Sequence, residues 1–143
     1  MKDRTTANTS TLMSELKDES NLSAFLEENK NLFLMENLPS FFLQMMHKYN
    51  IDRNEIISKS NIERSYCYQI LRGTRAASRD NYLKICMAMG LNLEDTQCAL
   101  TLAQVGQLYI KIKRDAAIIF SIQRQYDLDK TQDLLYTLGL KTL

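Results

Sequence analysis

Four polar side chains near the centre of the chain have the types and the spacing that recognition of DNA base edges requires. They are Arg64, Ser65, Tyr68 and Gln69. A helix places positions at these spacings on one face. Arginine and glutamine present forked hydrogen-bonding groups that match guanine and adenine in the major groove. The apolar side chains of Cys67 and Ile70 fall on the opposite face, where a protein core would lie.

Two short helices joined by a tight turn are expected to position this face. Asp52 is an N-cap candidate for a helix from Arg53 to Lys59. A turn at residues 60–62 separates it from a second helix over 63–72, and Gly73 supplies the left-handed residue that ends a helix. This layout is a helix-turn-helix, which presents its second helix to the major groove.

Basic residues are concentrated in the same part of the chain. The net charge of the whole chain is only +1, which argues against a protein that coats nucleic acid by bulk charge. Residues 53–84 nevertheless carry seven bases and three acids, a net of +4, and no acid falls between Arg64 and Arg79. The first fifty residues carry five bases and seven acids, a net of −2. The positive charge therefore follows the expected reading helix.

Composition and periodicity predict an all-α fold. Four glycines and one proline are few for sheets linked by tight turns, and the polar and apolar residues alternate with a helical period over most of the chain. No apolar run approaches the roughly 18 residues of a membrane span. The N-terminus lacks the apolar core of a signal peptide. We therefore expect a cytoplasmic protein that does not enter a membrane.

Residue types that carry catalysis or bind metals are few and poorly spaced. Cys67, Cys86 and Cys98 lack the spacing of metal ligands and are expected to be reduced core residues. The single histidine, His47, has no evident partners for a metal site. The sequence contains no glycine-rich phosphate loop, nucleophile elbow or histidine–carboxylate pattern. We therefore predict no enzyme activity, no metal and no cofactor.

Three regions are expected along the chain. Residues 1–36 form a flexible N-terminus, polar to about residue 9, followed by a helical extension with two short amphipathic helices over 10–17 and 21–33. This acidic region is either a packing extension or an interaction arm for a partner or a second copy. Residues 37–104 form the helix-turn-helix domain, and residues 105–143 form a C-terminal helical hairpin.

An internal repeat with an offset of 35 residues follows the helix-turn-helix. The sequence RDNYLKICMAMGLNLEDTQCALTLA, which starts at Arg79, aligns without a gap to RDAAIIFSIQRQYDLDKTQDLLYTL, which starts at Arg114. Asn92 and Asp127 occupy the same N-cap position of the two copies. Either a duplication or convergence on amphipathic hairpins explains the match. Both predict two similar helical hairpins that stack in tandem.

Several motifs between positions 38 and 92 carry a family resemblance. Ile56-Ile57 stands at a common Leu-Ala pair, and Arg72-Gly73 stands at the arginine-glycine that often ends a recognition helix. Further matches are the buried positions Ile62, Cys67 and Ile70 and the sequence Met89-Gly90-Leu91. In these residues the chain resembles helix-turn-helix proteins of the Cro and phage-repressor type, the Xre family. The resemblance implies a lambda-repressor-like bundle.

The chain departs from the family pattern at three places. Asn61 replaces the usual turn glycine, and asparagine tolerates the left-handed conformation that the turn needs. Leu71 replaces a glutamate that pairs with an arginine of the first helix, where this chain has Met46. An apolar contact between Met46 and Leu71 would replace that ion pair at little cost. Ala77 stands where proline is usual.

The resemblance implies roles for the exposed polar residues. Arg64, Ser65 and Gln69 stand at the family's base-contacting positions, and Tyr68 neighbours them as a fourth expected base contact. Arg53 stands at a phosphate-binding position, and Arg72 and Arg75 are the next expected phosphate contacts. Glu63 lies beside them, where an acid would reject phosphate or accept a hydrogen bond from a cytosine amino group.

Two functions fit these observations. In the first, the protein is a sequence-specific transcriptional regulator that reads double-stranded DNA with the helix over 63–72, and we expect a homodimer because one short helix reads only a few base pairs. In the second, it is a helical adaptor that does not bind DNA and holds a protein partner through the N-terminal arm or the C-terminal hairpin. The arginine-rich face favours the first function, and the near-neutral charge favours the second.

Overall fold

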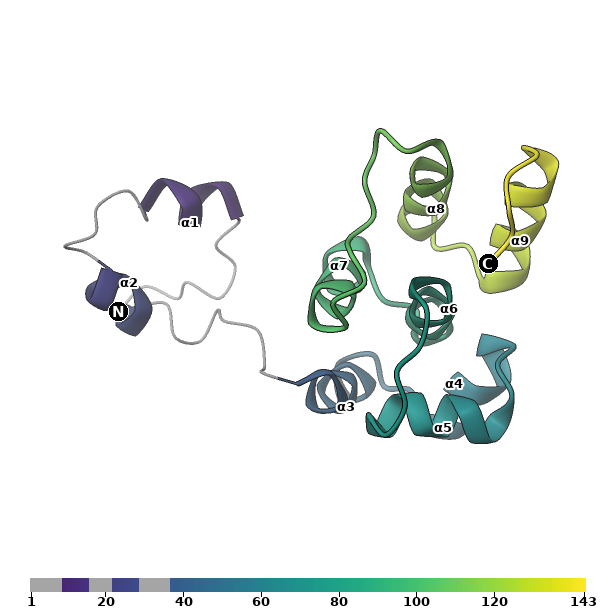
Figure 1. Ribbon diagram of the computed structural model, residues 1–143, viewed down its shortest axis with the longest axis horizontal. Coiled ribbons are helices and arrows are strands. Elements are labelled where there is room, and N and C mark those ends of the chain that lie inside the picture. Colours follow the sequence, from purple (N-terminus) through teal and green to yellow (C-terminus); the bar gives the residue numbers. More distant parts are fainter. Residues whose placement is uncertain (1–8, 16–21, 29–36) are drawn as a thin grey trace. The chain divides into compact units, whose positions relative to one another are not determined.

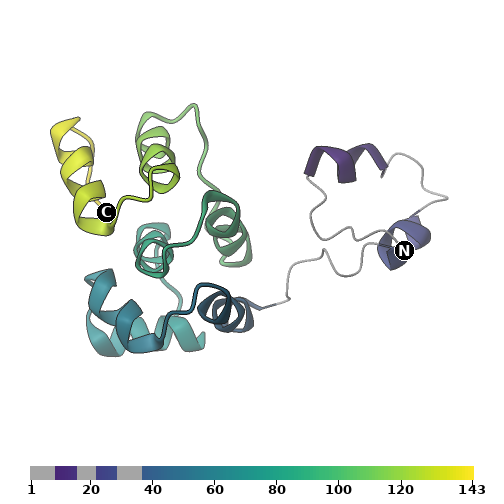
Figure 2. The ribbon, with the colours of Figure 1, turned by 180° about the vertical axis from the view of Figure 1, so that it is seen from behind.

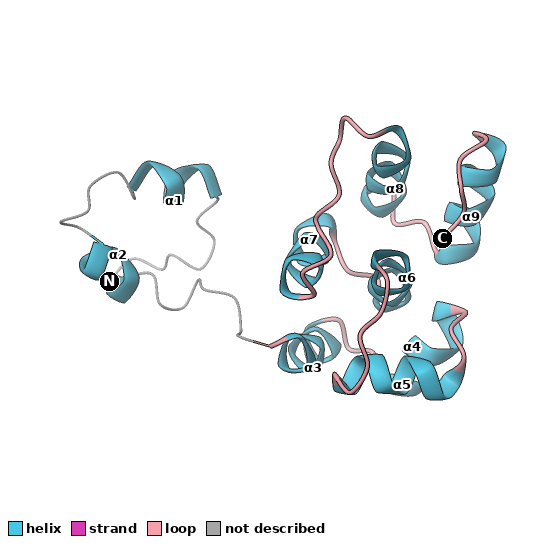
Figure 3. Cartoon of the chain, viewed as in Figure 1, coloured by secondary structure: helices cyan, strands magenta, loops and turns pink. Residues whose placement is uncertain are grey.

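A computed structural model describes residues 9–15, 22–28 and 37–143 of the chain (Figure 1). Within these ranges it contains nine α-helices and no strand, which confirms the predicted all-α fold (Figure 3). No helix among the described residues is both long enough and apolar enough to cross a membrane.

The chain divides into two units, Met1–Leu34 and Met35–Leu143. The first unit contains α1 (Thr9–Glu15), which starts one residue before the predicted stretch 10–17, and α2 (Leu22–Glu28), within the predicted stretch 21–33. The predicted C-terminal ends of these helices, and the disorder predicted for the first residues, lie outside the described residues.

The second unit begins with five helices that form a bundle. They are α3 (Leu38–Lys48), α4 (Arg53–Ser60), α5 (Arg64–Arg72), α6 (Arg79–Met89) and α7 (Leu93–Leu102). Their starts follow the predicted caps, because the side chains of Asp52 and Ser78 each accept a hydrogen bond from the backbone N–H three residues later. Phe42, Ile56 and Leu83 are fully buried in the core of this bundle.

The turns around α5 depend on two left-handed residues. Asn61 ends α4 with a φ of 56°, as its tolerance for this conformation predicts. Gly73 ends α5 with a φ of 77°. A Cβ atom on Gly73 would lie only 2.4 Å from Cγ of Pro39, in the first turn of α3. Gly73 is therefore required both for its backbone conformation and for the close approach of α3 to the end of α5.

The substitutions relative to the family pattern are accommodated in the core. Leu71 is buried, and Met46 is partly buried and packs against the same apolar cluster. Helix α3 packs on α5, so apolar packing takes the place of an ion pair in this part of the bundle.

The C-terminal hairpin lies on the far side of α6 and α7 from the helix-turn-helix. It consists of α8 (Lys113–Gln123) and α9 (Leu128–Thr137). Helix α8 packs on α7 and α9 packs on α6, whereas α4 packs on the other side of α6 (Figures 1 and 2). The helices α4 and α5 and the helix α8 thus lie on opposite sides of the second unit.

The two hairpins repeat the same hydrogen bonds at the 35-residue offset. The side-chain amide of Gln97 donates to the carbonyl of Leu108 at 2.9 Å and accepts from its N–H at 2.8 Å. Gln132 makes the same pair of bonds to Leu143, at 2.9 and 2.7 Å. The left-handed residues also recur at this offset, Gly90 with Gln125 and Gln104 with Gly139. The predicted tandem hairpins are therefore present, and their similarity extends past the aligned sequence to the chain end.

Reciprocal ion pairs join the starts of α6 and α8. Arg79 donates to Asp115 at 2.6 and 3.0 Å, and Arg114 donates to Asp80 at 3.0 Å with each of two nitrogens. Each copy of the Arg-Asp dipeptide thus pairs with the other copy, as in a local two-fold arrangement. Asp115 also accepts from the N–H of Tyr109 at 2.9 Å. Burial opposes ionisation of Asp115, but its hydrogen bonds from Arg79 and Tyr109 lower its pKa overall.

Candidate nucleic-acid interface

Helix α5 begins with a carboxylate cap. One oxygen of Glu63 accepts from the N–H of Ser65 at 3.0 Å, and the other accepts from the N–H of Tyr66 at 2.9 Å. These two backbone hydrogen bonds lower the pKa of Glu63. The side chain is therefore turned toward its own helix, where it satisfies two of the N–H groups that a helix start leaves free. This local role was not anticipated from the sequence, which suggested a role in the groove.

The four predicted base contacts lie together on α5. Arg64, Ser65 and Gln69 are exposed, and Tyr68 is half-buried between them. A shallow hollow of about 470 Å³ covers this face. Its lining residues are Arg64, Ser65, Tyr68, Gln69, Arg72 and Thr74. Cys67 and Ile70 are buried on the opposite face, as their spacing predicted.

A side chain of the preceding helix holds the first of these residues. Oδ1 of Asn54, on α4, accepts a hydrogen bond from Nη2 of Arg64 at 3.1 Å. The bond uses one of the five N–H donors of the guanidinium and turns the group toward α4. Asn54 was not among the residues predicted from the sequence, since a bond between positions ten residues apart depends on how the two helices cross.

Two arginines converge on the ring of Tyr68. The guanidinium carbon of Arg53, at the start of α4, lies 4.8 Å from the ring centroid, and that of Arg72, at the end of α5, lies 5.3 Å from it. These are distances at which a cation is attracted to an aromatic face. Tyr68 thus holds two of the predicted phosphate contacts close to the predicted base contacts.

The third predicted phosphate contact lies apart from this pair. The guanidinium carbon of Arg75 is 4.7 Å from the ring centroid of Tyr66, which is on the flank of α5 rather than on the face of Tyr68. Six of the seven predicted site residues therefore form one group that includes Tyr68, on α5 or at the start of α4. The seventh, Arg75, lies at the margin of this group.

The arginines of this face differ from three other cations of the unit in their partners. Lys48, Arg79 and Arg114 each form an ion pair with a carboxylate at 3.0 Å or less. Within the described part of the chain, the four arginines of the face form no ion pair with a carboxylate, and all four are exposed. They are Arg53, Arg64, Arg72 and Arg75. Their charges remain available to an anionic ligand.

A larger hollow of about 1150 Å³ lies elsewhere, between α4 and the turns of the two hairpins. Its charged lining residues have mixed signs, with Glu55, Lys59, Asp127 and Asp129 among them. It therefore lacks the accumulation of positive charge that would attract a phosphate backbone. The smaller hollow over α5 is the better candidate for a nucleic acid in spite of its size.

Comparisons with known proteins add no family. No family model, no curated protein and no solved structure matches this chain. Among the described residues, no cluster of three or more His, Cys, Asp or Glu side chains has the arrangement of a metal site.

Proposed function

We propose that the protein is a sequence-specific DNA-binding transcriptional regulator that reads the major groove with α5. One observation carries the proposal: four exposed arginines without carboxylate partners surround the polar face of a helix that follows a tight turn. Three other cations of the same unit, Lys48, Arg79 and Arg114, are paired with carboxylates. An excess of unpaired positive charge around one helix is what a polyanionic ligand requires.

The side chains of this face divide into base and phosphate contacts. Arg64 retains free N–H groups beside its bond to Asn54, and these suit the O6 and N7 acceptors of guanine. Gln69 suits adenine, and Ser65 can bond either kind of base edge. The edge of the Tyr68 ring would contact a thymine methyl group. Arg53 and Arg72, which both lie over that ring, would bind the phosphates that flank the bases.

Membership of the Xre family is part of the proposal. The order of five helices, the tight turn at Asn61 and the glycine end of α5 support it. The motifs between positions 38 and 92 support it independently, since their apolar members are the residues that the bundle buries.

A homodimer is also part of the proposal. One helix of nine residues contacts only a few base pairs, so a useful degree of specificity requires two copies on a two-fold symmetric site. Two α5 helices separated by about 34 Å would enter successive major grooves on one side of the duplex.

Binding to a pool of random duplexes tests the phosphate contacts. We expect the full-length protein to bind a fluorescent duplex at about 50 mM salt, with affinity that falls steeply as salt rises. Arg53→Ala should weaken binding to all duplexes and reduce the slope of log K against log salt by about 0.9. Arg124→Ala is the matched control, because Arg124 also lies over an aromatic ring but on α8's side of the molecule. Absence of binding at low salt, or equal losses for Arg53→Ala and Arg124→Ala, would rule out this interface.

A second candidate is a protein adaptor, which the exposed apolar side chains of the C-terminal hairpin favour. Phe120 and Leu138 are 42% and 54% exposed. A pull-down with and without nuclease separates the two functions. A single stoichiometric protein partner that nuclease does not release, together with no DNA binding, would favour the adaptor.

A further inference from the structure

In the first hairpin, formed by α6 and α7, the face away from the second hairpin is covered by other helices of the chain. We call this face the outer face. Helix α4 packs on α6 and α3 packs on α7, so two helices of the same chain cover this face. Ile85 and Met89 of α6 are 0% and 3% exposed. The outer face of the first hairpin is therefore a surface that binds helices.

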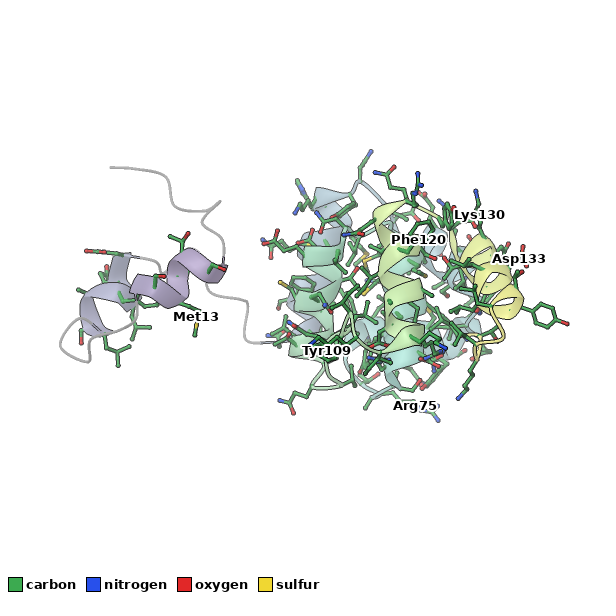
Figure 4. All side chains as sticks on the ribbon, turned by 90° about the horizontal axis from the view of Figure 1, so that it is seen from above. Met13, Arg75, Tyr109, Phe120, Lys130 and Asp133 are labelled. Carbon is green, nitrogen blue, oxygen red and sulfur yellow. The ribbon has the colours of Figure 1, made fainter. Side chains whose placement is uncertain are left out.

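The corresponding face of the second hairpin is open. The offset of 35 residues takes Ile85 to Phe120 and Met89 to Arg124. Phe120 is 42% exposed and Arg124 is also exposed, although their counterparts are buried. Figure 4 shows Phe120 on the surface of α8 with Lys130 of the next helix beside it. We call this surface, formed by Phe120, Arg124, Tyr126, Lys130 and Leu134, the open face.

The charge on the open face is reversed relative to the covered one. On the covered face Asp95 accepts hydrogen bonds from Lys48 at 2.8 Å and from the hydroxyl of Tyr49 at 2.7 Å, both at the end of α3. The offset takes Asp95 to Lys130. A helix that occupies the open face in the manner of α3 therefore needs a carboxylate where α3 has Lys48.

Neither cation of the open face is neutralised within the described part of the chain. The ammonium nitrogen of Lys130 lies 4.2 Å from the ring centroid of Tyr126, and Arg124 lies 5.3 Å from that of Phe120, but neither forms an ion pair with a carboxylate. The acids nearby on α9 are Asp129 and Asp133, which are exposed, and Asp127, which caps the helix. The two aromatic rings pack edge to face with 5.9 Å between their centroids.

The position of the open face indicates the kind of partner. It lies on α8 and α9, on the opposite side of the unit from α5 (Figures 1 and 4). Two copies joined through this face would place their α5 helices at opposite ends of the assembly, so a second copy does not suit it. A different protein would reach it without competing with a ligand on α5.

We propose that the open face docks an amphipathic helix of a protein partner, which places apolar side chains on Phe120 and Leu134 and a carboxylate on Lys130. The occupant resembles α3 in its apolar side and differs from it in the sign of one charge. The docking does not depend on DNA binding, so either proposal can fail without the other.

A peptide derived from α3 serves as the probe. It contains residues 37–50 with Lys48→Glu, and with Leu43→Lys and His47→Asp so that a lactam bridge joins the new amine and carboxyl groups. Positions 43 and 47 are exposed in α3 and so lie off the docking side. The matched control is the same bridged peptide with the natural Lys48. Fluorescence anisotropy of the labelled peptides is measured against the full-length protein without DNA.

We expect the Lys48→Glu peptide to bind about fivefold more tightly than the control, the scale of a well-placed exposed ion pair. Lys130→Glu in the protein should reverse this preference. Phe120→Glu should abolish binding, and Tyr136→Glu should leave it unchanged, since Tyr136 is 80% exposed on another side of α9. Circular dichroism checks that each variant is folded.

Three results would overturn the proposal. The first is no binding of the Lys48→Glu peptide up to about 1 mM. The second is that wild type and Lys130→Glu show the same preference between the two peptides, because reversal of the charge at position 130 would then have no effect on binding. The third is self-association of the full-length protein in analytical ultracentrifugation that Phe120→Glu abolishes, which would make a second copy the occupant.

Discussion

The carboxylate of Asp115 should be the most costly polar group to alter where the two hairpins meet. Its side chain is 0% exposed and accepts two hydrogen bonds from Arg79 and one from the N–H of Tyr109. The reciprocal carboxylate, Asp80, is 25% exposed and accepts from Arg114, which has two further carbonyl acceptors. Both ion pairs are formed by the repeated Arg-Asp dipeptides, but their carboxylates differ in burial. The two pairs therefore offer a controlled comparison.

The magnitudes follow from this difference. Asp115→Asn keeps the shape of the side chain but removes its charge and one of the two oxygens that accept from Arg79, whose other acceptor is the carbonyl of Gln107 at 3.4 Å. Removal of one partner from a buried ion pair costs about 3–5 kcal/mol. Because the side chain of Arg79 is 26% exposed, we expect the lower end, about 3 kcal/mol. Asp80→Asn should cost about 1 kcal/mol, since water reaches both partners.

The difference should also depend on pH. The pKa of Asp115 is lowered in the folded protein, so its contribution is fully present above the unfolded-state pKa of about 3.9. It is lost as the pH falls through the lower pKa of the folded state. The gap in unfolding free energy between wild type and Asp115→Asn should therefore narrow below about pH 4.

Urea unfolding followed by circular dichroism, at neutral pH and at about pH 3, measures these quantities. A greater loss for Asp80→Asn than for Asp115→Asn would refute the reasoning from burial. A gap that stays constant with pH would show that the charge of Asp115 is not the stabilising feature.

Three further predictions concern other parts of the second unit. Gly73→Ala should destabilise the protein by about 2–3 kcal/mol, against about 1 kcal/mol for Gly90→Ala in the same urea assay, because both have positive φ but only Gly73 touches the proline ring of α3; equal losses would contradict the close approach. Gln132→Ala should speed hydrogen exchange at the backbone amide of Leu143, whose N–H donates to the side chain of Gln132, and unchanged exchange would argue against this hydrogen bond. Burial raises the pKa of Cys86 to about 12, so a thiol reagent at about pH 8 should modify the half-buried Cys98 first, and faster labelling of Cys86 would contradict its burial.

Local signals made the helices of the second unit predictable. Asp52 and Ser78 cap the helices that follow them, and the predicted bounds of Arg79–Met89 agree with the structure. Caps and left-handed ends depend on residues within one turn of each other, so the sequence contains the whole signal. The same holds for the buried and exposed sides of α5, which follow from helical spacing.

Contacts between distant residues were not predictable in the same way. The repeated Arg-Asp dipeptide was visible, but its crossed pairing depends on how the two hairpins pack, with α9 on α6 and α8 on α7. The convergence of Arg53 and Arg72 on one tyrosine ring joins positions on two helices. The cap formed by Glu63 was missed for another reason, because glutamate is uncommon among the residues that cap helices.

Selection of bound duplexes from a random-sequence library, with full-length protein as bait, tests the central claim most directly. We predict enrichment of a short motif repeated with two-fold symmetry, with centres about 10 base pairs apart. Arg64→Ala and Gln69→Ala should each relax the motif at one position in each half. A bound pool with no enriched motif, from protein that is folded by circular dichroism, would contradict the account of α5 as a reader of DNA sequence.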